Sequence, residues 1–284
     1  MSKKNKIIIK SKTLVKSYRY GSTLELTTAA GNHYQGTKVL PGKRYVVLST
    51  GEIKNMKTDA KNRADNLKSV KSTMRKLRRL IAHNFNGGLN QLWITLTYAV
   101  NVTDTHIVME DFKLFIRRLR EQYDNLDYIS VIEPQASGRW HLHLLLKQSS
   151  GERLTIQNTM IADLWRKGFT KTKRLSNADK VANYVLAYLT NLDIPNGPDS
   201  TSKKYVKGAR LYLYPKGLRI YRRSKGINDP PEMTDFKSNI LAQNNVTNSE
   251  ADFAIYRTHE TPDGYKVSYT TEYYNNLEMR NRNE

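Results

Sequence analysis

Two histidines that alternate along one segment are the residues of this chain best suited to chemistry. His141 and His143 lie in the run WHLHLLL (140–146). In a β-strand, residues i and i+2 project from the same face, so the two imidazoles would stand side by side. The tryptophan and leucines between them would form the core face, which leaves the histidines on the face away from the core. Neutral imidazoles are common metal ligands, so the pair is a candidate metal site.

A carboxylate stands at a spacing that suits this pair. Glu133 ends the run YISVIE (128–133), and the residues PQASGR between the two runs are typical of a β-hairpin. If Glu133 pairs with His141, it shares a face with both histidines, whereas a slip of one residue would move it to the other face. Two imidazoles and one carboxylate suit a divalent cation with open positions for a substrate oxygen. The alternative, which stays open, is that the histidines are ordinary surface or core residues.

A pair of tyrosines forms the second reactive feature. Tyr184 and Tyr188 lie in NADKVANYVLAYLTN (177–191), where their spacing puts both on one face of a helix, with Lys180 one turn earlier. A tyrosine hydroxyl can attack phosphorus when a metal ion withdraws charge from the non-bridging oxygens. The products would be a phosphotyrosine and a free hydroxyl on the other DNA fragment, so the step is reversible. The alternative is that these are packing residues, since the chain has 18 tyrosines.

The elements that would position these side chains follow one another in the order β-α-β-β-α-β-α. They are a strand over 93–98 (WITLTY), a helix over about 110–122, strands over 128–133 and 140–146, a helix ending at Gly168, a strand over 169–173 and a helix from Asn177 to about 190. This order predicts an α+β fold with a ferredoxin-like (RRM-like) antiparallel sheet. We expect the helices on one face of the sheet, with the tyrosine-bearing helix near the metal site.

The charge of the chain favours a polyanion as its partner. The 284 residues include 47 Lys and Arg against 26 Asp and Glu, a net charge of +21. The charge is uneven, at +16 over residues 1–90, +10 over 91–228 and −5 over 229–284.

A basic helix is predicted over residues 55–83, which lack glycine and proline. Its apolar residues recur at helical spacing. Its other faces carry Lys68, Lys71, Arg75, Lys76, Arg78 and Arg79. These side chains form either a solvated helix face or a contact with nucleic acid phosphates. The small number of acidic residues nearby favours the phosphate contact.

Several classes of protein are excluded by what the sequence lacks. It has no cysteine, so disulfides, thiolate metal sites and a cysteine nucleophile are ruled out, and any metal site must use His, Asp or Glu. It has no apolar run near ~18 residues and no signal-peptide pattern, so we expect a cytoplasmic protein. It has no G-x-x-x-x-G-K-[ST] phosphate loop, so a fused ATP-driven helicase is not expected.

These residues resemble the motifs of the HUH-type rolling-circle replication initiators (Rep endonucleases) of plasmids and phages. The chain is most similar to the group that contains the filamentous-phage gene II replication protein. WITLTY (93–98), HLH (141–143) and the tyrosine helix match three family motifs in order, and the resemblance covers about residues 90–225. LYLYPKGLRIYRRSKGI (211–227) also resembles a segment that follows the nuclease core in such proteins.

The resemblance implies a role for each residue of the two reactive pairs. His141 and His143 would bind Mg²⁺ or Mn²⁺ with Glu133 as the third ligand, and Tyr184 or Tyr188 would be the nucleophile. Many relatives carry a lysine three residues after the catalytic tyrosine, where this chain has Ala187 and Asn191. This departure leaves open which tyrosine leads. The supporting or DNA-binding candidates are Lys180, Thr95, Thr97 and Arg139.

Four regions are expected along the chain. They are a basic N-terminal region of weak strands and a helix (1–88), the HUH endonuclease core (89–195), a basic and aromatic DNA-contact segment (196–228) and a polar, mildly acidic, flexible tail (229–284). Residues 203–225 hold nine Lys and Arg among four tyrosines. This pattern is typical of a single-strand binding surface, and a hairpin around Pro215-Lys216-Gly217 with ordinary strand tyrosines is the alternative.

The leading hypothesis is a rolling-circle initiator that nicks and rejoins single-stranded origin DNA through a covalent 5′-phosphotyrosine. Its partners would be origin DNA and a host helicase. A related HUH transposase or relaxase is the second hypothesis, although the tyrosine of relaxases usually precedes the histidines and here follows them. The third is a non-catalytic DNA- or RNA-binding protein.

Overall fold

The computed structural model describes residues 8–28, 36–56, 59–135, 137–175, 210–246, 250–260 and 266–275. Residues 60–229 form one compact unit, and residues 1–59 together with 230–284 form another. The expected boundary after residue 88 is therefore wrong. The helix that precedes it packs into the same core as the sheet that follows it.

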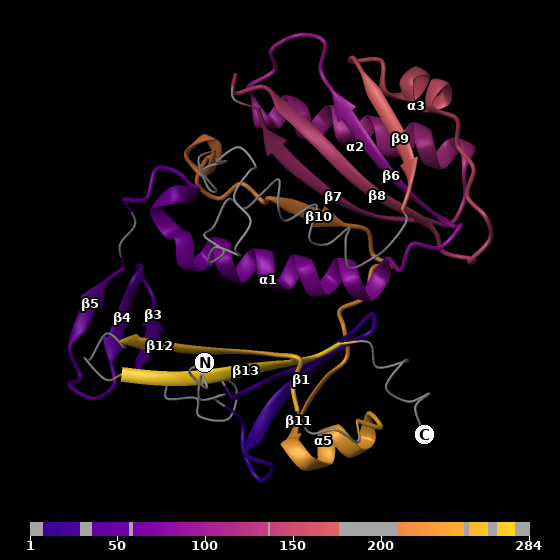
Figure 1. Cartoon of the computed structure of the whole chain (residues 1–284). Coiled ribbons are helices and arrows are strands. Elements are labelled where there is room, and N and C mark those ends of the chain that lie inside the picture. Colours follow the sequence, from indigo (N-terminus) through magenta and orange to yellow (C-terminus); the bar gives the residue numbers. More distant parts are fainter. Residues whose placement is uncertain are drawn as a thin grey trace, which may run out of the picture. The chain divides into compact units, whose positions relative to one another are not determined.

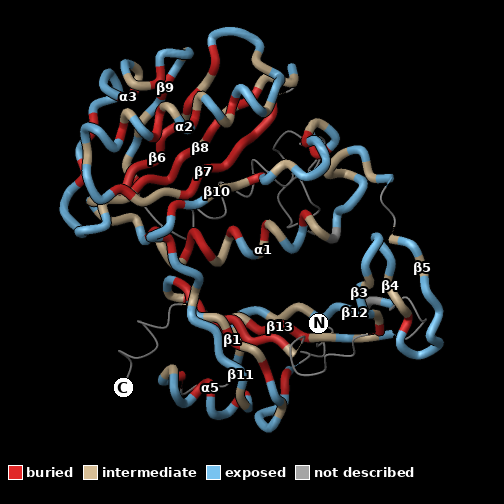
Figure 2. Tube along the Cα trace, turned by 180° about the vertical axis from the view of Figure 1, so that it is seen from behind, coloured by how far each residue is buried: buried red, intermediate tan, exposed pale blue. Residues whose placement is uncertain are grey.

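The unit of residues 60–229 is built on a five-stranded sheet (Figure 1). Its strands are β6 (Gln91–Thr97), β7 (Leu126–Pro134), β8 (Trp140–Gln148), β9 (Thr170–Arg174) and β10 (Tyr221–Arg223). They lie in the order β10-β7-β8-β6-β9, and every neighbouring pair is antiparallel. Buried residues are concentrated along β6, β7 and β8 (Figure 2).

Two helices connect the strands of this sheet. α2 (Thr105–Gln122) joins β6 to β7, and α3 (Asn158–Trp165) joins β8 to β9, so the first six predicted elements are confirmed in their order. α2 begins after Asp104, whose carboxylate accepts a hydrogen bond from the His106 backbone N–H at 2.7 Å. Its buried residues recur every three or four positions and form one apolar stripe. The predicted helix after Asn177 lies outside the described residues.

The helix α1 (Leu67–Asn84) lies on the other face of the sheet from α2. Its stripe of apolar residues is buried in the same core as the strands; the members are Val70, Met74, Leu77, Leu80 and Ile81. Lys147 of β8 reaches the C-terminal end of this helix, where its Nζ lies 3.5 Å from Asn84 Oδ1 and 5.9 Å from the centre of the Phe85 ring. The expectation of helices on one face is therefore wrong, because the apolar residues on both faces need a cover.

The basic residues of α1 lie outside this stripe, and Lys71 and Lys76 are exposed. Their predicted contact with nucleic acid phosphates stays a prediction. None of the helices in the described ranges combines the length and the hydropathy that crossing a membrane requires.

The second unit combines both ends of the chain. Its five-stranded sheet has the order β11-β1-β2-β13-β12. The strands are β1 (Leu14–Tyr20), β2 (Thr23–Thr27), β11 (Glu232–Phe236), β12 (Phe253–Glu260) and β13 (Lys266–Tyr274). A short helix, α5 (Lys237–Gln243), follows β11, and β3 (Thr37–Leu40), β4 (Arg44–Val47) and β5 (Ile53–Asn55) form a separate three-stranded sheet.

The prediction of a flexible C-terminal tail is wrong for most of residues 232–274. β11 pairs with β1, and β13 pairs with β2, so this region completes a sheet that the N-terminal strands begin. Its core includes Val15, Leu26, Ile240 and Tyr274, all with exposed fractions of 0%. The polar composition of the region misled the prediction, because the partner strands are more than 200 residues away in the sequence.

Candidate active site

The strand register brings the predicted metal ligands to one face of the sheet. Glu133 of β7 is the direct partner of His141 of β8, and Val131 is the partner of His143, as predicted. On the other side of β8, His143 pairs with Thr95 of β6. His141 pairs in the same way with Thr97. The two histidines, Glu133 and the two threonines therefore project from the same face.

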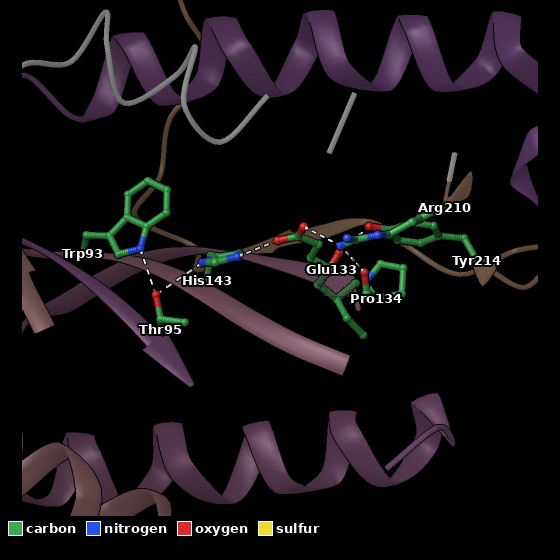
Figure 3. Close-up of polar contacts among 8 residues, drawn as sticks. Trp93, Thr95, Glu133, Pro134, His143, Arg210 and Tyr214 are labelled. Atoms are coloured by element: carbon green, nitrogen blue, oxygen red, sulfur yellow. Dashed lines mark hydrogen bonds and ion pairs between the residues drawn. The ribbon is translucent and has the colours of Figure 1, made fainter. Parts of the chain in front are cut away.

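This face is more enclosed than the sequence analysis predicts. The histidines were expected on a face away from the core, but Val131 and Leu145 on the same face are 1% exposed. The side chains of His143 and Glu133 are only 12% and 11% exposed. α1 accounts for this burial, since it lies on the side of the sheet to which these side chains project (Figure 3).

His143 is held by a chain of hydrogen bonds. Its Nε2 lies 2.8 Å from Glu133 Oε2, and its Nδ1 lies 3.4 Å from Thr95 Oγ1 (Figure 3). The indole N–H of Trp93 donates to the same threonine oxygen at 3.2 Å. Because Thr95 Oγ1 accepts that bond, its own proton can be donated to Nδ1, which leaves the Nε2 proton facing the carboxylate. Such a carboxylate–histidine pair fixes the ring orientation and the tautomer.

Glu133 has a second partner that sequence analysis did not assign to the site. Nη1 of Arg210 lies 3.6 Å from Glu133 Oε1 and donates to the Pro134 carbonyl at 3.1 Å. Nearby, the hydroxyl of Tyr214 donates to the Ile132 carbonyl at 2.8 Å. Arg210 lies far beyond Glu133 in the sequence, and only its place in a basic run marks it there.

His141 differs from His143 in having an unsatisfied ring nitrogen. Its Nε2 is buried and has no hydrogen-bond partner among the described residues. Burial lowers the pKa of His141 to about 4, and the neighbouring His143 contributes to this shift. The ring is therefore neutral near pH 7, and a buried neutral nitrogen without a partner is costly unless a ligand satisfies it.

The three predicted ligands fit a divalent ion by type and by register. Two neutral imidazoles and a carboxylate on one face are a suitable donor set, and the unsatisfied His141 Nε2 is suited to a further bond. In the described part of the chain, however, no group of three such side chains is arranged to hold a metal ion. Glu133 is engaged by His143 and Arg210 instead.

The remaining candidates occupy different positions. The Arg139 guanidinium donates to Gln135 Oε1 at 2.7 Å and to the Tyr98 carbonyl at 3.2 Å, which ties the β7–β8 loop to the end of β6. The Thr97 carbonyl accepts from the Trp165 indole N–H at 3.0 Å. DNA contacts by these residues remain predictions. Tyr184, Tyr188 and Lys180 lie outside the described residues.

The segment before β10 contains packing tyrosines as well as an exposed one. Tyr214 is 2% exposed, its ring centre is 5.3 Å from that of Trp140, and Tyr221 packs against the same core. Tyr212 is 59% exposed. The packing alternative is therefore confirmed for Tyr214 and Tyr221, while Tyr205 lies outside the described residues.

The comparison with protein families concerns the region that contains this site. No curated protein and no solved structure matches the chain significantly. Residues 91–193 match a family model described as a replication-associated protein, of the kind called ORF2 or gene 2 protein. This range begins with β6, includes Glu133 and both histidines, and extends past the two tyrosines. This part of the chain is therefore similar to replication-associated proteins, which supports a relation to a family of phage and plasmid replication initiators.

Proposed function

We propose that this protein is an HUH-type rolling-circle initiator that nicks and rejoins single-stranded origin DNA. The observation that carries the proposal is the pairing of Glu133 with His141, with the Glu133–His143 contact beside it, inside the segment that matches a replication family. The strand order β9-β6-β8-β7, with α2 and α3 as crossovers, supports the ferredoxin-like fold that the proposal assumes.

His141, His143 and Glu133 would hold Mg²⁺ or Mn²⁺. When bound, such an ion withdraws charge from the non-bridging oxygens of the scissile phosphate. His141 would contribute a neutral imidazole with an unsatisfied Nε2. His143 and Glu133 would exchange their 2.8 Å hydrogen bond for bonds to the ion, and Thr95 would keep the His143 ring oriented through Nδ1.

Tyr184 or Tyr188 would be the nucleophile. Attack forms a bond between the phenolic oxygen and phosphorus and breaks the bond from phosphorus to the 3′ oxygen of the other fragment. The phenol loses its proton and the departing oxygen gains one, so the step is balanced and can be reversed to rejoin the strand. Opening of the duplex would be left to a host helicase.

Formation of a covalent protein–DNA adduct tests this proposal. The protein is incubated with single-stranded DNA from its replicon and Mn²⁺, and adducts are resolved on a denaturing gel. We expect an adduct with the wild type that is lost in EDTA and in His141→Ala, and that at least one of Tyr184→Phe and Tyr188→Phe abolishes. Tyr212→Phe, which alters an exposed tyrosine, is the matched control. An adduct that persists in the double variant at positions 184 and 188 would overturn the proposed nucleophile.

A non-catalytic DNA- or RNA-binding protein is the second candidate. It is favoured by the engagement of Glu133 with His143 and Arg210 in place of a three-ligand group among the described residues. Such a protein would bind oligonucleotides equally well in EDTA and would form no adduct under any condition. The same gel, run beside a binding assay, separates the two candidates.

A further inference from the structure

A cavity of about 600 Å³ lies on the opposite face of the sheet from the histidines, between α2 and the strands β7 and β10. Tyr128 of β7 belongs to this face, since it alternates with the residues that share the face of Glu133. We name it the α2–β10 cavity and define it by Phe112, Ile116 and Tyr128 in its floor and Arg117, Arg120 and Arg222 at its rim. Its volume lies in the range of sites that bind small molecules.

The floor of the α2–β10 cavity is aromatic and apolar. Phe112 and Ile116 are 3% and 6% exposed, and the Phe112 and Tyr128 rings meet edge to face with their centres 5.6 Å apart. Burial raises the pKa of the half-buried Tyr128 hydroxyl, so it stays protonated and can donate a hydrogen bond. A floor of this kind suits a flat ring.

The rim carries positive charge that the protein itself neutralises poorly. Arg117 lies 4.0 Å from Glu121, and both side chains are largely exposed, so this pair is weak. The Arg120 guanidinium lies 5.7 Å from the centre of the Tyr128 ring and makes a long hydrogen bond of 3.4 Å to the Leu126 carbonyl. The described residues provide no hydrogen bond or ion pair for Arg222.

An anion at the rim would relieve this unbalanced charge. Burial and the nearby charge of Arg219 lower the pKa of Arg222, which shows that its charged form is strained where it stands. Guanidinium groups match phosphate oxygens in geometry and bind them with paired hydrogen bonds. A ligand for this cavity therefore needs a phosphate, or a similar anion, beside an aromatic ring.

We propose that the α2–β10 cavity binds one nucleotide of a nucleic acid strand, with the phosphate at Arg120 and Arg222 and the base over the aromatic floor. The inference does not rest on the proposed function, because it needs neither a metal ion nor a tyrosine nucleophile. The cavity and the histidine site lie on opposite faces of one sheet. One strand that occupied both would have to pass around an edge of the sheet.

Binding of a short labelled oligonucleotide to the full chain, measured by fluorescence anisotropy in EDTA, tests the proposal. We expect Arg120→Gln combined with Arg222→Gln to weaken binding about tenfold or more, from the loss of two phosphate contacts and of one stacked base. Arg153→Gln combined with Arg166→Gln is the matched control, since these exposed arginines lie outside the cavity lining and the net charge changes equally. The control should bind within about twofold of the wild type, less the small loss expected from charge alone.

A cross-linking experiment places the base. An oligonucleotide with one photoreactive pyrimidine should label a peptide that contains Tyr128 or Phe112, and Tyr128→Phe should keep that labelling. Equal affinities of the cavity variant and the charge control would overturn the proposal, as would labelling confined to the histidine face. Displacement of the oligonucleotide by an acidic peptide, but not by a nucleotide, would also overturn it and indicate a protein partner. Loss of adduct formation in His141→Ala with this binding intact would distinguish the cavity from the proposed nuclease site.

Discussion

Two buried polar clusters in this molecule differ in how completely their atoms are satisfied. In the unit formed by the two ends of the chain, Lys237 and Glu272 are 2% and 0% exposed and lie 2.9 Å apart. Glu272 also accepts from the Ile9 backbone N–H at 2.7 Å and from the Tyr274 hydroxyl at 2.9 Å. Lys237 in turn donates to the Ile9 carbonyl at 2.9 Å. Each charged group is therefore neutralised and bonded by the protein itself.

The cluster of the β6–β8 sheet is incomplete by contrast. His143 and Glu133 are bonded to each other, but His141 Nε2 has no partner among the described residues, and Arg210 is 48% exposed. A saturated buried cluster adds to the specificity of the fold. An unsaturated one costs stability, and such a cost is expected where a ligand completes the site. The difference separates a structural cluster from a functional one.

The largest expected effect comes from breaking the saturated cluster. Lys237→Met leaves the Glu272 carboxylate buried without its counter-charge, which should reduce the free energy of unfolding by about 3–5 kcal/mol. Hydrogen exchange of peptides from β11 and β13 measures this change in its own unit. Adding Glu272→Gln should recover part of the loss, and Lys16→Met, which breaks an exposed 2.9 Å pair with Glu232, should cost less than about 1 kcal/mol. Similar losses in both single variants would show that the buried pair is not special.

The unsaturated cluster should respond in the opposite direction. His141→Leu removes a buried nitrogen without a partner, so we expect the free energy of unfolding to rise by about 1 kcal/mol while adduct formation disappears. Tryptophan fluorescence during urea unfolding reports on this unit alone, because Trp93, Trp140 and Trp165 all lie in it. Destabilisation by this substitution would mean that the His141 ring is already satisfied.

The pH dependence of stability should show the same difference on a smaller scale. The pKa of His141 falls from its ordinary value of 6.5 to about 4 in the folded protein. The unfolded chain therefore binds the proton more readily between these values, and stability falls as the pH decreases through this window. The stability gap between His141→Leu and the wild type should widen as the pH drops from about 7 to about 4. A constant gap would contradict the lowered pKa.

Arg210 should have the smallest effect on stability. Its contact with Glu133 is long, at 3.6 Å, and its side chain is half exposed, so Arg210→Gln should change the free energy of unfolding by less than about 1 kcal/mol. We expect tighter Mn²⁺ binding in this variant, measured by calorimetry, because a cation beside Glu133 opposes a second one. Weaker Mn²⁺ binding would place Arg210 in support of the ion site.

Local pattern was sufficient to predict the paired strands and the ligand register. The alternation of β8 and the short link from Glu133 to Trp140 restrict the hairpin to few registers, so Glu133 could be matched with His141 before the fold was known. Charge composition likewise located the basic part of the chain. The same alternation could not show whether the histidine face was open, because its cover, α1, comes from a different part of the sequence.

The sequence by itself therefore determined the elements whose contacts are local: β6 to β9, the helices between them, and the face shared by Glu133, His141 and His143. Only the tertiary structure decided the contacts between distant segments. It placed Arg210 beside Glu133, paired β11 with β1, and made the supposed tail part of a sheet. It also put Arg222 of β10 beside the arginines of α2. The physical reason is that period and propensity act over a few residues, whereas these contacts join segments about 75 to 260 residues apart through burial and charge that no local pattern records.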